Sequence, residues 1–293
     1  MSLFKLLPRL AAAGFLAAST LLVPAQATMV RFHTAYGPID IDLYDNTAAG
    51  TVQNFLSYVR QDAYMQSFIH RHEANFVIQG GGYNWPVGNV AGYVPTGAPI
   101  VNEYSADRPN VRGTIAMAKQ GGNPDSATSQ WFFNLKDNTT TLGPSNNGGF
   151  TVFGQVTAPG MAVVDRIAAL TVVNAGGLFP QLPVRKPWAT GQTMTREHLV
   201  FIDKASELPA KASLSPSDRI FNYLEAAYPQ YAAPASPASA TTDGYYFRYY
   251  SATNAYVGTK DGQVWYLVPA LGSQITRLGS IDELLATAQA NGY

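Results

Sequence analysis

The feature that most restricts the fold of this chain is a succession of short segments in which apolar and polar residues alternate, separated by glycine-rich turns. Residues 29–34 and 39–43 alternate in this way on either side of Gly37-Pro38, which predicts a hairpin with one buried face. Further strands are expected at 67–72, 76–79, 114–118, 131–134, 151–156 and 199–202. Two helices are expected before residue 204, at 48–60 and 161–169. Many short strands with few helices indicate an antiparallel barrel or sandwich.

The first predicted helix shows how such an element would pack. Asn46 or Thr47 is the expected N-cap. The apolar positions of the helix recur at helical spacing and form one stripe against a core: Val52, Phe55, Leu56 and Val59.

Charge and cysteine content exclude several classes of protein. The 293 residues include 19 basic and 19 acidic side chains and no cysteine, with a pI near 6.9. This balance argues against a nucleic-acid partner, which requires a basic face. The lack of cysteine excludes disulfides, thiolate nucleophiles and thiolate metal sites. The length allows one large or two small domains.

The N-terminus has the pattern of an export signal. Lys5 and Arg9 precede an apolar run at 10–23, and Pro24-Ala25-Gln26-Ala27 ends it. These features predict a signal peptide at 1–27, cleaved after Ala27. A membrane anchor is the alternative, but the apolar run is shorter than the ~20 residues that a span requires. The mature protein is therefore expected to be exported without a membrane span, with the periplasm favoured and secretion left open.

The composition changes after Lys204. We therefore expect a first domain at 28–204, a linker at 205–214 and a separate small α+β module at 215–293. Ser215 and Pro216 predict the start of a helix, and Ser280 with Glu283 predicts a capping box for the last one. Residues 232–242 are expected to be flexible. The tyrosine-rich stretch at 245–266 is either a docking surface or the core and cross-strand ladder of a small sheet, and we favour the ladder. The role of the module is unknown.

Three stretches of sequence carry the residues expected at a functional site. They read FIHRHEANFVIQGG at 68–81, AMAK at 116–119 with SATSQWFFN at 126–134, and GFTVFGQV at 149–156. In this order they resemble the cyclophilin-type peptidyl-prolyl cis-trans isomerases, in particular the bacterial exported type. The resemblance covers residues 29–203.

The resemblance implies a fold, an activity and a set of site residues. The fold would be a closed eight-stranded antiparallel barrel with two capping helices, to which this chain adds the α+β module. The activity would be rotation of X-Pro bonds in unfolded or flexible polypeptides, with no cofactor and no metal. Arg71 would be the essential arginine and Gln79 would steady it. The residues assigned to substrate binding are His70, Phe76, Val77, Ala118, Lys119, Gln130, Phe132, Leu142 and Phe150.

These residue types suit the reaction. Rotation about X-Pro crosses a barrier of ~18–20 kcal/mol because resonance stabilises the planar amide. No bond is made or broken, so the enzyme needs only to bind the twisted amide better than either planar form. A guanidinium from Arg71 could donate to the pyramidal proline nitrogen, and it stays charged at any relevant pH. The neutral amide of Gln79 could orient the guanidinium without the competing pull of a carboxylate.

Some positions differ from the family pattern. Thr141 stands where the pocket-rim tryptophan that binds cyclosporin is expected, which predicts weak binding of that drug. Phe150 replaces a rim histidine, and Lys119 replaces an asparagine that acts through its backbone. Trp131 replaces a phenylalanine on the core side. These changes concern substrate preference more than the reaction.

Other functions remain as alternatives. A non-catalytic binder of proline peptides, or a holdase chaperone, would keep the pocket but turn over poorly. His70, His72 and Glu73 could suggest a zinc site, but they lack a further well-spaced ligand. Gly80-Gly81-Gly82 has neither the Lys-Ser/Thr of a P-loop nor its strand-to-helix setting, and is expected to form a sharp turn beside the pocket.

Overall fold

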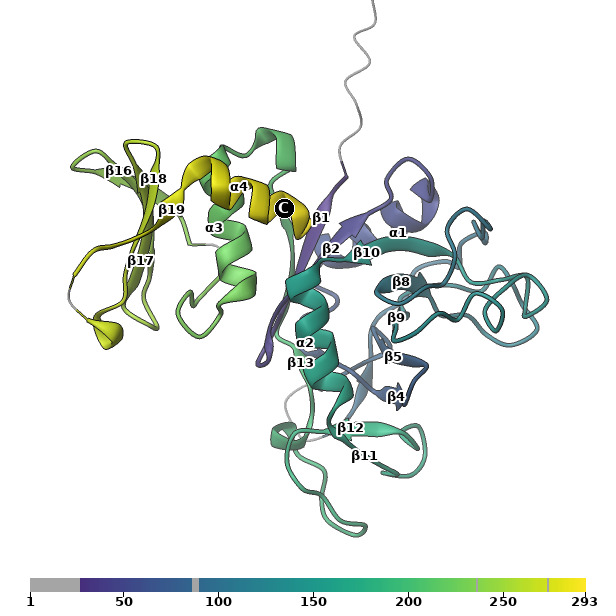
Figure 1. Cartoon of the computed structure of the whole chain (residues 1–293). Helices are drawn as coiled ribbons and strands as arrows, with labels where there is room; N and C mark the ends of the chain where they lie inside the picture. Colours follow the sequence, from purple (N-terminus) through teal and green to yellow (C-terminus); the bar gives the residue numbers. More distant parts are fainter. Residues whose placement is uncertain (1–26, 86–89, 236, 273) are drawn as a thin grey trace, which may run out of the picture.

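The structure is a computed structural model that describes residues 27–85, 90–235, 237–272 and 274–293. The predicted signal peptide therefore lies outside the described residues, apart from Ala27. The described chain forms two units, a larger one built on a curled sheet and a smaller one at the C-terminal end (Figure 1).

The larger unit is built on an eight-stranded antiparallel sheet in the order β14-β1-β2-β10-β8-β9-β5-β4. Its strands are β1 (Met29–Thr34), β2 (Gly37–Leu43), β4 (Arg71–Glu73), β5 (Val77–Gly80), β8 (Thr114–Met117), β9 (Trp131–Asn134), β10 (Val152–Val156) and β14 (Lys204–Leu208). The predicted hairpin is confirmed as β1 and β2, with Val30 paired to Ile41.

The expectation of a closed barrel is wrong, because the edge strands β4 and β14 do not pair. The strand expected at 67–72 is broken by Ile69-His70 into β3 (Ser67–Phe68) and β4. β3 pairs instead with β13 (Phe201–Ile202), in a second sheet of order β13-β3-β6-β7 that includes β6 (Tyr83–Asn84) and β7 (Gly92–Tyr93). The free edge of β4 is partly covered by another segment, since His72 N donates to the carbonyl of Gln181 at 2.8 Å.

Two helices pack against the curled sheet, as predicted. They are α1 (Ala49–Arg60) and α2 (Ala158–Ala168). All four residues of the predicted α1 stripe are buried. They pack into one core with Phe32 and Trp131, which are both fully buried. A short hairpin of β11 (Thr171–Val173) and β12 (Leu182–Val184) follows α2.

The predicted N-cap of α1 and the predicted start of α2 are wrong. No side chain at the N-cap of α1 bonds to its first turn. Instead, Glu103 accepts from the backbone N–H groups of Gly50 at 3.1 Å and Thr51 at 2.6 Å. A carboxylate suits this position because of the unpaired N–H groups and the helix dipole. α2 begins three residues before the predicted Met161, capped by Thr157, which accepts from Gly160 N.

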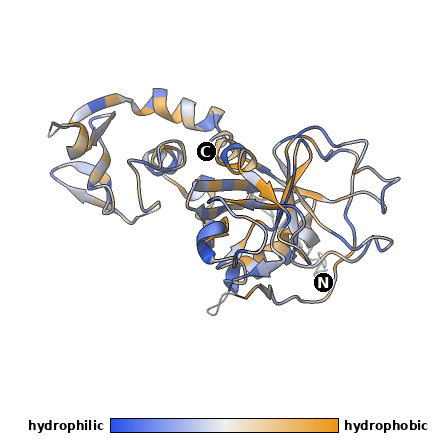
Figure 2. Cartoon of the chain, turned by 90° about the horizontal axis from the view of Figure 1, so that it is seen from below, coloured by the Kyte–Doolittle hydropathy of each residue, from blue (hydrophilic) through white to orange (hydrophobic). Residues whose placement is uncertain are grey.

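The smaller unit has two helices on one side of a five-stranded antiparallel sheet (Figure 1). Its elements are α3 (Pro216–Ala227), β15 (Ser239–Thr242), β16 (Tyr245–Tyr250), β17 (Ala255–Lys260), β18 (Gln263–Leu267), β19 (Thr276–Ser280) and α4 (Ile281–Ala290). The Ser215 cap and the Ser280–Glu283 capping box are both confirmed. Hydrophobic and hydrophilic residues are interspersed along the helices of the chain (Figure 2).

The tyrosines divide between the two faces of this sheet. Tyr250 is fully buried and Tyr246 packs on the core beside it, which agrees with the ladder interpretation. Tyr245 and Phe247 instead line a cavity of about 250 Å³ on the opposite face, and Tyr249 is 39% exposed. Part of the segment expected to be flexible, 239–242, forms β15.

The two units share a buried interface, which the sequence did not indicate. Of the segment assigned to a linker, residues 205–208 belong to β14 and pair with β1, and 211–213 form a 3₁₀ turn. α3 contacts β2 and α2. Both faces of the β1–β2 hairpin are therefore covered, and not one as expected.

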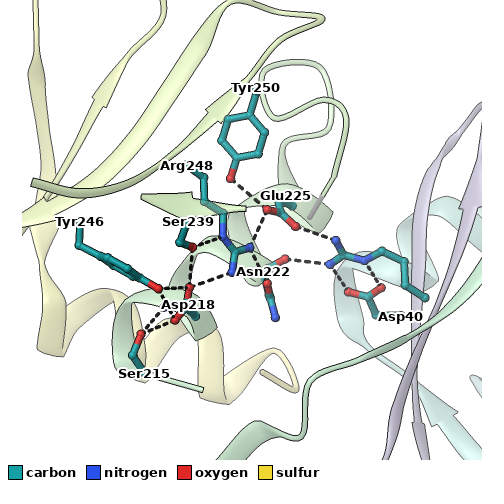
Figure 3. A network of polar contacts seen from close by, with 10 residues as sticks. Asp40, Ser215, Asp218, Asn222, Glu225, Ser239, Tyr246, Arg248 and Tyr250 are labelled. Atoms are coloured by element: carbon teal, nitrogen blue, oxygen red, sulfur yellow. Dashed lines mark hydrogen bonds and ion pairs between the residues drawn. The ribbon is translucent and has the colours of Figure 1, made fainter. Parts of the chain in front are cut away.

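Charged residues fill this interface (Figure 3). Arg31 is fully buried and donates to Asp40 at 2.6 and 2.7 Å and to Glu225 of α3 at 2.7 Å. Arg248 of β16 donates to the same Glu225 at 2.8 Å and to Asp218 at 3.0 Å. The charge on Arg31 is favoured by its two carboxylates, which raise its pKa above the ordinary value despite the opposing effect of burial.

Candidate active site

One cavity of about 250 Å³ brings together nine of the eleven residues predicted for the site, together with Asn146. The residues that line it are Arg71, Phe76, Val77, Gln79, Ala118, Lys119, Asn146, Phe132, Leu142 and Phe150. His70 and Gln130 are the two predicted residues that do not line it.

The sheet register explains why residues far apart in sequence meet here. Arg71 on β4 pairs with Gln79 on β5, and Gln79 pairs with Phe132 on β9. Side chains at paired positions of neighbouring antiparallel strands point to the same face. Ala116 on β8 pairs with Phe132 in turn, so Ala118, which follows β8, reaches the far side of the cavity.

The floor of the cavity is apolar. Val77, Phe132 and Leu142 are buried, at 2%, 4% and 4% exposure, and form a small cluster separate from the main core. Phe76 and Phe150 pack against it. The rings of Phe132 and Phe150 meet edge to face, with centroids 5.9 Å apart. This surface suits an apolar ring such as the pyrrolidine of proline.

A buried chain of asparagines holds the loop that carries Leu142 and Phe150. Asn138 Nδ2 donates to the Phe76 carbonyl at 3.0 Å and to Asn134 Oδ1 at 2.8 Å. Asn134 donates to Asn110, and Asn110 donates to the Phe150 carbonyl at 3.0 Å. Asn110 and Asn138 were not among the residues expected at the site, since asparagines in loops carry no distinctive spacing.

The guanidinium of Arg71 lies at the mouth of the cavity and has three side-chain partners. Its Nε donates to Gln181 Oε1 at 3.0 Å, its Nη1 to Gln79 Oε1 at 3.4 Å, and its Nη2 to the carboxylate of Glu73. Gln79, the residue expected to steady Arg71, is one of the three. The other two were not expected from the sequence: Glu73 forms an ion pair with Arg71, and Gln181 comes from a segment 110 residues away.

Gln130 and His70 do not line the cavity but are both hydrogen-bonded to Gln79, which does. The side chain of Gln130 accepts from Gln79 Nε2 at 2.8 Å, and its carbonyl accepts from Ala118 N at 2.9 Å. His70 is 5% exposed, with its ring at the edge of Tyr83. Burial lowers the pKa of His70 to about 4, so the ring is neutral at pH 7.

Three consecutive glycines, at 80–82, allow the chain to pass close to the segment 129–131 beside the cavity. A Cβ on Gly80 would lie 2.7 Å from the Trp131 ring, and one on Gly82 would lie 2.8 Å from the side chain of Gln130. Gly81 has φ +75°, and a Cβ there would lie 2.6 Å from the Ser129 carbonyl. Both the close approach and the positive φ favour glycine, as expected for a sharp turn beside the pocket. Trp131 is fully buried, which confirms its placement on the core side.

Lys119 closes one side of the cavity. Its Nζ donates to the carbonyls of Asn147 at 2.8 Å and Gly149 at 2.5 Å. It also lies 4.8 Å from the centroid of the Phe150 ring, a favourable cation–π distance. Partial burial lowers the pKa of Lys119. Thr141 is exposed and does not contribute to the cavity lining.

The described residues include neither a metal-binding cluster nor a helix that could span a membrane. Among them, no three histidine, aspartate or glutamate side chains are grouped so that they could hold a metal ion. None of the described helices has both the length and the apolar character needed to cross a membrane.

The sequence matches known proteins over the unit that carries this cavity. Residues 29–186 match the family described as cyclophilin type peptidyl-prolyl cis-trans isomerase. A peptidyl-prolyl cis-trans isomerase of Acinetobacter baylyi is 46% identical over 170 residues, which cover 56% of this chain and 87% of that protein. Peptidyl-prolyl cis-trans isomerase B of Escherichia coli is 41% identical over 50% of this chain and 88% of its own length.

A solved structure of a cyclophilin type isomerase from Cryptosporidium parvum, in the presence of the dipeptide Ala-Pro, is 19% identical to this chain. The alignment of the two structures covers 62% of this chain and 99% of the Cryptosporidium chain, with a TM-score of 0.45. The assignment of the family rests on the sequence matches. The match of more than half of the chain and the identity to curated isomerases show that this protein belongs to the cyclophilin-type peptidyl-prolyl cis-trans isomerases.

Proposed function

We propose that this isomerase uses Arg71 to lower the barrier to X-Pro rotation while the proline ring occupies the cavity formed by Phe76, Val77, Phe132 and Leu142. The observation that carries the proposal is that Arg71, with a partly exposed side chain, lines the same cavity as these apolar residues. A proline ring seated there would bring its nitrogen close to the only cationic fork among the described residues that line the cavity.

The mechanism requires that the twisted amide gain an interaction that the planar forms lack. As the amide twists, the proline nitrogen loses resonance and becomes a hydrogen-bond acceptor. An N–H from Arg71 donates to it most strongly at that point, in a site shielded on one side by apolar side chains. Ala118 and Gln130 would keep the peptide in register through backbone and amide contacts, while Gln79 holds the side chain of Gln130 in place.

We also propose that the substrates are exported proteins and that the enzyme acts in the periplasm, with secretion as the alternative. The N-terminal pattern at 1–27 supports export. The described structure adds a second point: Thr28, the first residue after the predicted cleavage site, donates through its backbone N and its hydroxyl to the carboxylate of Asp45, at 2.7 and 2.8 Å. Cleavage after Ala27 would turn that N–H group into an ammonium that faces a carboxylate.

Two further expectations belong to this proposal. Cyclosporin should bind weakly, because Thr141 offers no indole donor at the rim and lies exposed beside the cavity. Clients should be unfolded or flexible segments, since the proline ring must enter an apolar cavity that a folded chain would not reach.

The test is exchange NMR on a short Ala-Pro peptide with protein that begins at Thr28. The unmodified protein should speed cis-trans exchange, and Arg71→Ala should abolish most of the acceleration while peptide binding persists. Arg112→Ala is the matched control, because Arg112 is an exposed arginine paired with Asp165 on another face. If Arg71→Ala keeps the full exchange rate, the proposed role of Arg71 is wrong. Binding without acceleration by the unmodified protein would favour the holdase alternative.

A further inference from the structure

Arg71 occupies a position that does little to fix its side chain. It lies on β4, a strand of three residues at the edge of the sheet. Its side chain is 34% exposed. A free arginine side chain has about 2 kcal/mol of rotamer entropy to lose when it is held in one geometry. A catalytic guanidinium on such a strand therefore needs partners outside its own backbone.

The three hydrogen bonds of Arg71 leave a defined pair of donors. A guanidinium has five N–H groups, one on Nε and two on each Nη. Gln181 takes the N–H of Nε, Gln79 takes one on Nη1, and Glu73 takes one on Nη2. Within the described residues, one N–H on Nη1 and one on Nη2 remain for a substrate.

The three partners do not contribute equally. The bond to Gln79 is long, at 3.4 Å, and the amide nitrogen of Gln79 is committed to Gln130 at 2.8 Å. Gln181 accepts at 3.0 Å, and Glu73 adds opposite charge to its hydrogen bond, which makes it the stronger kind. The orientation of the guanidinium therefore depends mainly on Gln181 and Glu73.

Both of these residues are held by the backbone around them. The carbonyl of Gln181 accepts from His72 N at 2.8 Å, next to Arg71 on β4. Leu182, which follows it, is 1% exposed and packs in a cluster with Phe68. Glu73 pairs with Val77 across the β4–β5 ladder. Each residue thus supplies an acceptor, on an anchored stretch of backbone, for a different nitrogen of the guanidinium.

We propose that Glu73 and Gln181 are positioning residues that clamp the Arg71 guanidinium at two of its nitrogens, so that its two remaining N–H groups face the proline amide. This inference rests on the role proposed for Arg71. The Glu73 side chain is 43% exposed, so water screens its attraction for the guanidinium charge. The carboxylate can therefore fix the geometry without cancelling the charge that acts on the substrate.

The experiment separates the rate on the enzyme from peptide affinity. Gln181→Leu and Glu73→Ala should each slow exchange of the bound Ala-Pro peptide by about tenfold or more, the scale of one lost hydrogen bond to a charged group. The peptide dissociation constant should change by less than about twofold, because neither residue lines the cavity. Gln181→Glu keeps the acceptor and should retain most of the rate. Gln61→Leu and Glu197→Gln are controls at exposed positions.

A double-mutant comparison identifies the route of action. In the Arg71→Ala background, Gln181→Leu and Glu73→Ala should have no further effect, because the group that they position is gone. An equal loss with and without Arg71 would overturn the clamp and indicate a separate contact with the substrate. So would normal exchange rates in both single variants.

These outcomes are distinct from a failure of the proposed function. If Arg71→Ala itself has no effect, the proposed role of Arg71 is wrong, and so is the positioning role of Glu73 and Gln181 that depends on it. If Arg71→Ala is inactive but the Glu73 and Gln181 variants are fully active, only the clamp is wrong. Thermal melts of each variant show whether a lost rate reflects unfolded protein.

Discussion

Glu225 offers the sharpest test of how the two units are joined. Its carboxylate is 0% exposed and accepts from Arg31 at 2.7 Å, from Arg248 at 2.8 Å and from Tyr250 at 3.1 Å. Glu225→Ala would remove the one carboxylate that lies between the two guanidinium groups (Figure 3). The guanidinium groups of Arg31 and Arg248 would then repel each other.

The expected loss follows from the partners that stay. Removing one member of a buried ion pair costs about 3–5 kcal/mol. Arg31 keeps Asp40 and Arg248 keeps Asp218, so we expect the lower end, about 3 kcal/mol. Glu197→Ala removes an exposed partner of Lys186 and should cost less than about 1 kcal/mol.

The assay is equilibrium unfolding in urea, followed by tryptophan fluorescence. Trp131 reports on the core of the larger unit and Trp265 on the sheet of the smaller one. Glu225→Ala should lower the midpoint and separate the two transitions, because the interface that couples the units is weakened. A loss below about 1 kcal/mol, with no change in the shape of the transition, would refute this account of the interface.

Three other predictions follow from single sites. Asn138→Ala should weaken Ala-Pro peptide binding by roughly fivefold in an NMR titration, since it frees the loop that carries Leu142 from the Phe76 carbonyl; unchanged affinity would contradict this. Burial lowers the pKa of His70 to about 4 from an ordinary 6.5. Between these two pH values, His70 therefore binds a proton in the unfolded chain but not in the native state. Stability should therefore fall as the pH drops from 6.5 towards 4, by an amount on the order of 3 kcal/mol, and His70→Gln should reduce that slope in urea titrations. Protein that begins at Thr28 should have a higher melting temperature than a form extended by two residues at the N-terminus. The free energy of unfolding should differ by up to about 1 kcal/mol, as expected for a partly exposed ion pair, and Asp45→Asn should remove the difference.

The local elements were predictable because their causes lie within a few residues. The apolar stripe of α1, the Ser280–Glu283 capping box and the β1–β2 hairpin depend on spacing alone, and all three are confirmed. The family resemblance also named nine residues that the structure gathers around one cavity, eight of them within the three motifs. Their grouping follows from strand register, in which paired positions share a face.

The structure differs from expectation where the partner of a residue lies far away in sequence. α1 is capped by Glu103 and not by a neighbouring residue, and Arg71 is held by Gln181 across 110 residues. The sheet stays open because the short strands that precede its edge strands pair with each other in a different sheet. None of these contacts has a local periodicity that the sequence could reveal.

The sequence by itself determined most of the strands and helices, which face of most of them is apolar, and nine of the residues that line the cavity. Only the tertiary structure decided the environment of the polar positions. The alternation in β1 and β2 marks Arg31 and Asp40 as an outer, solvated face, yet both are fully buried beneath α3. A charged side chain can be buried when a carboxylate or guanidinium from another element compensates it, and only the fold brings Glu225 to that position.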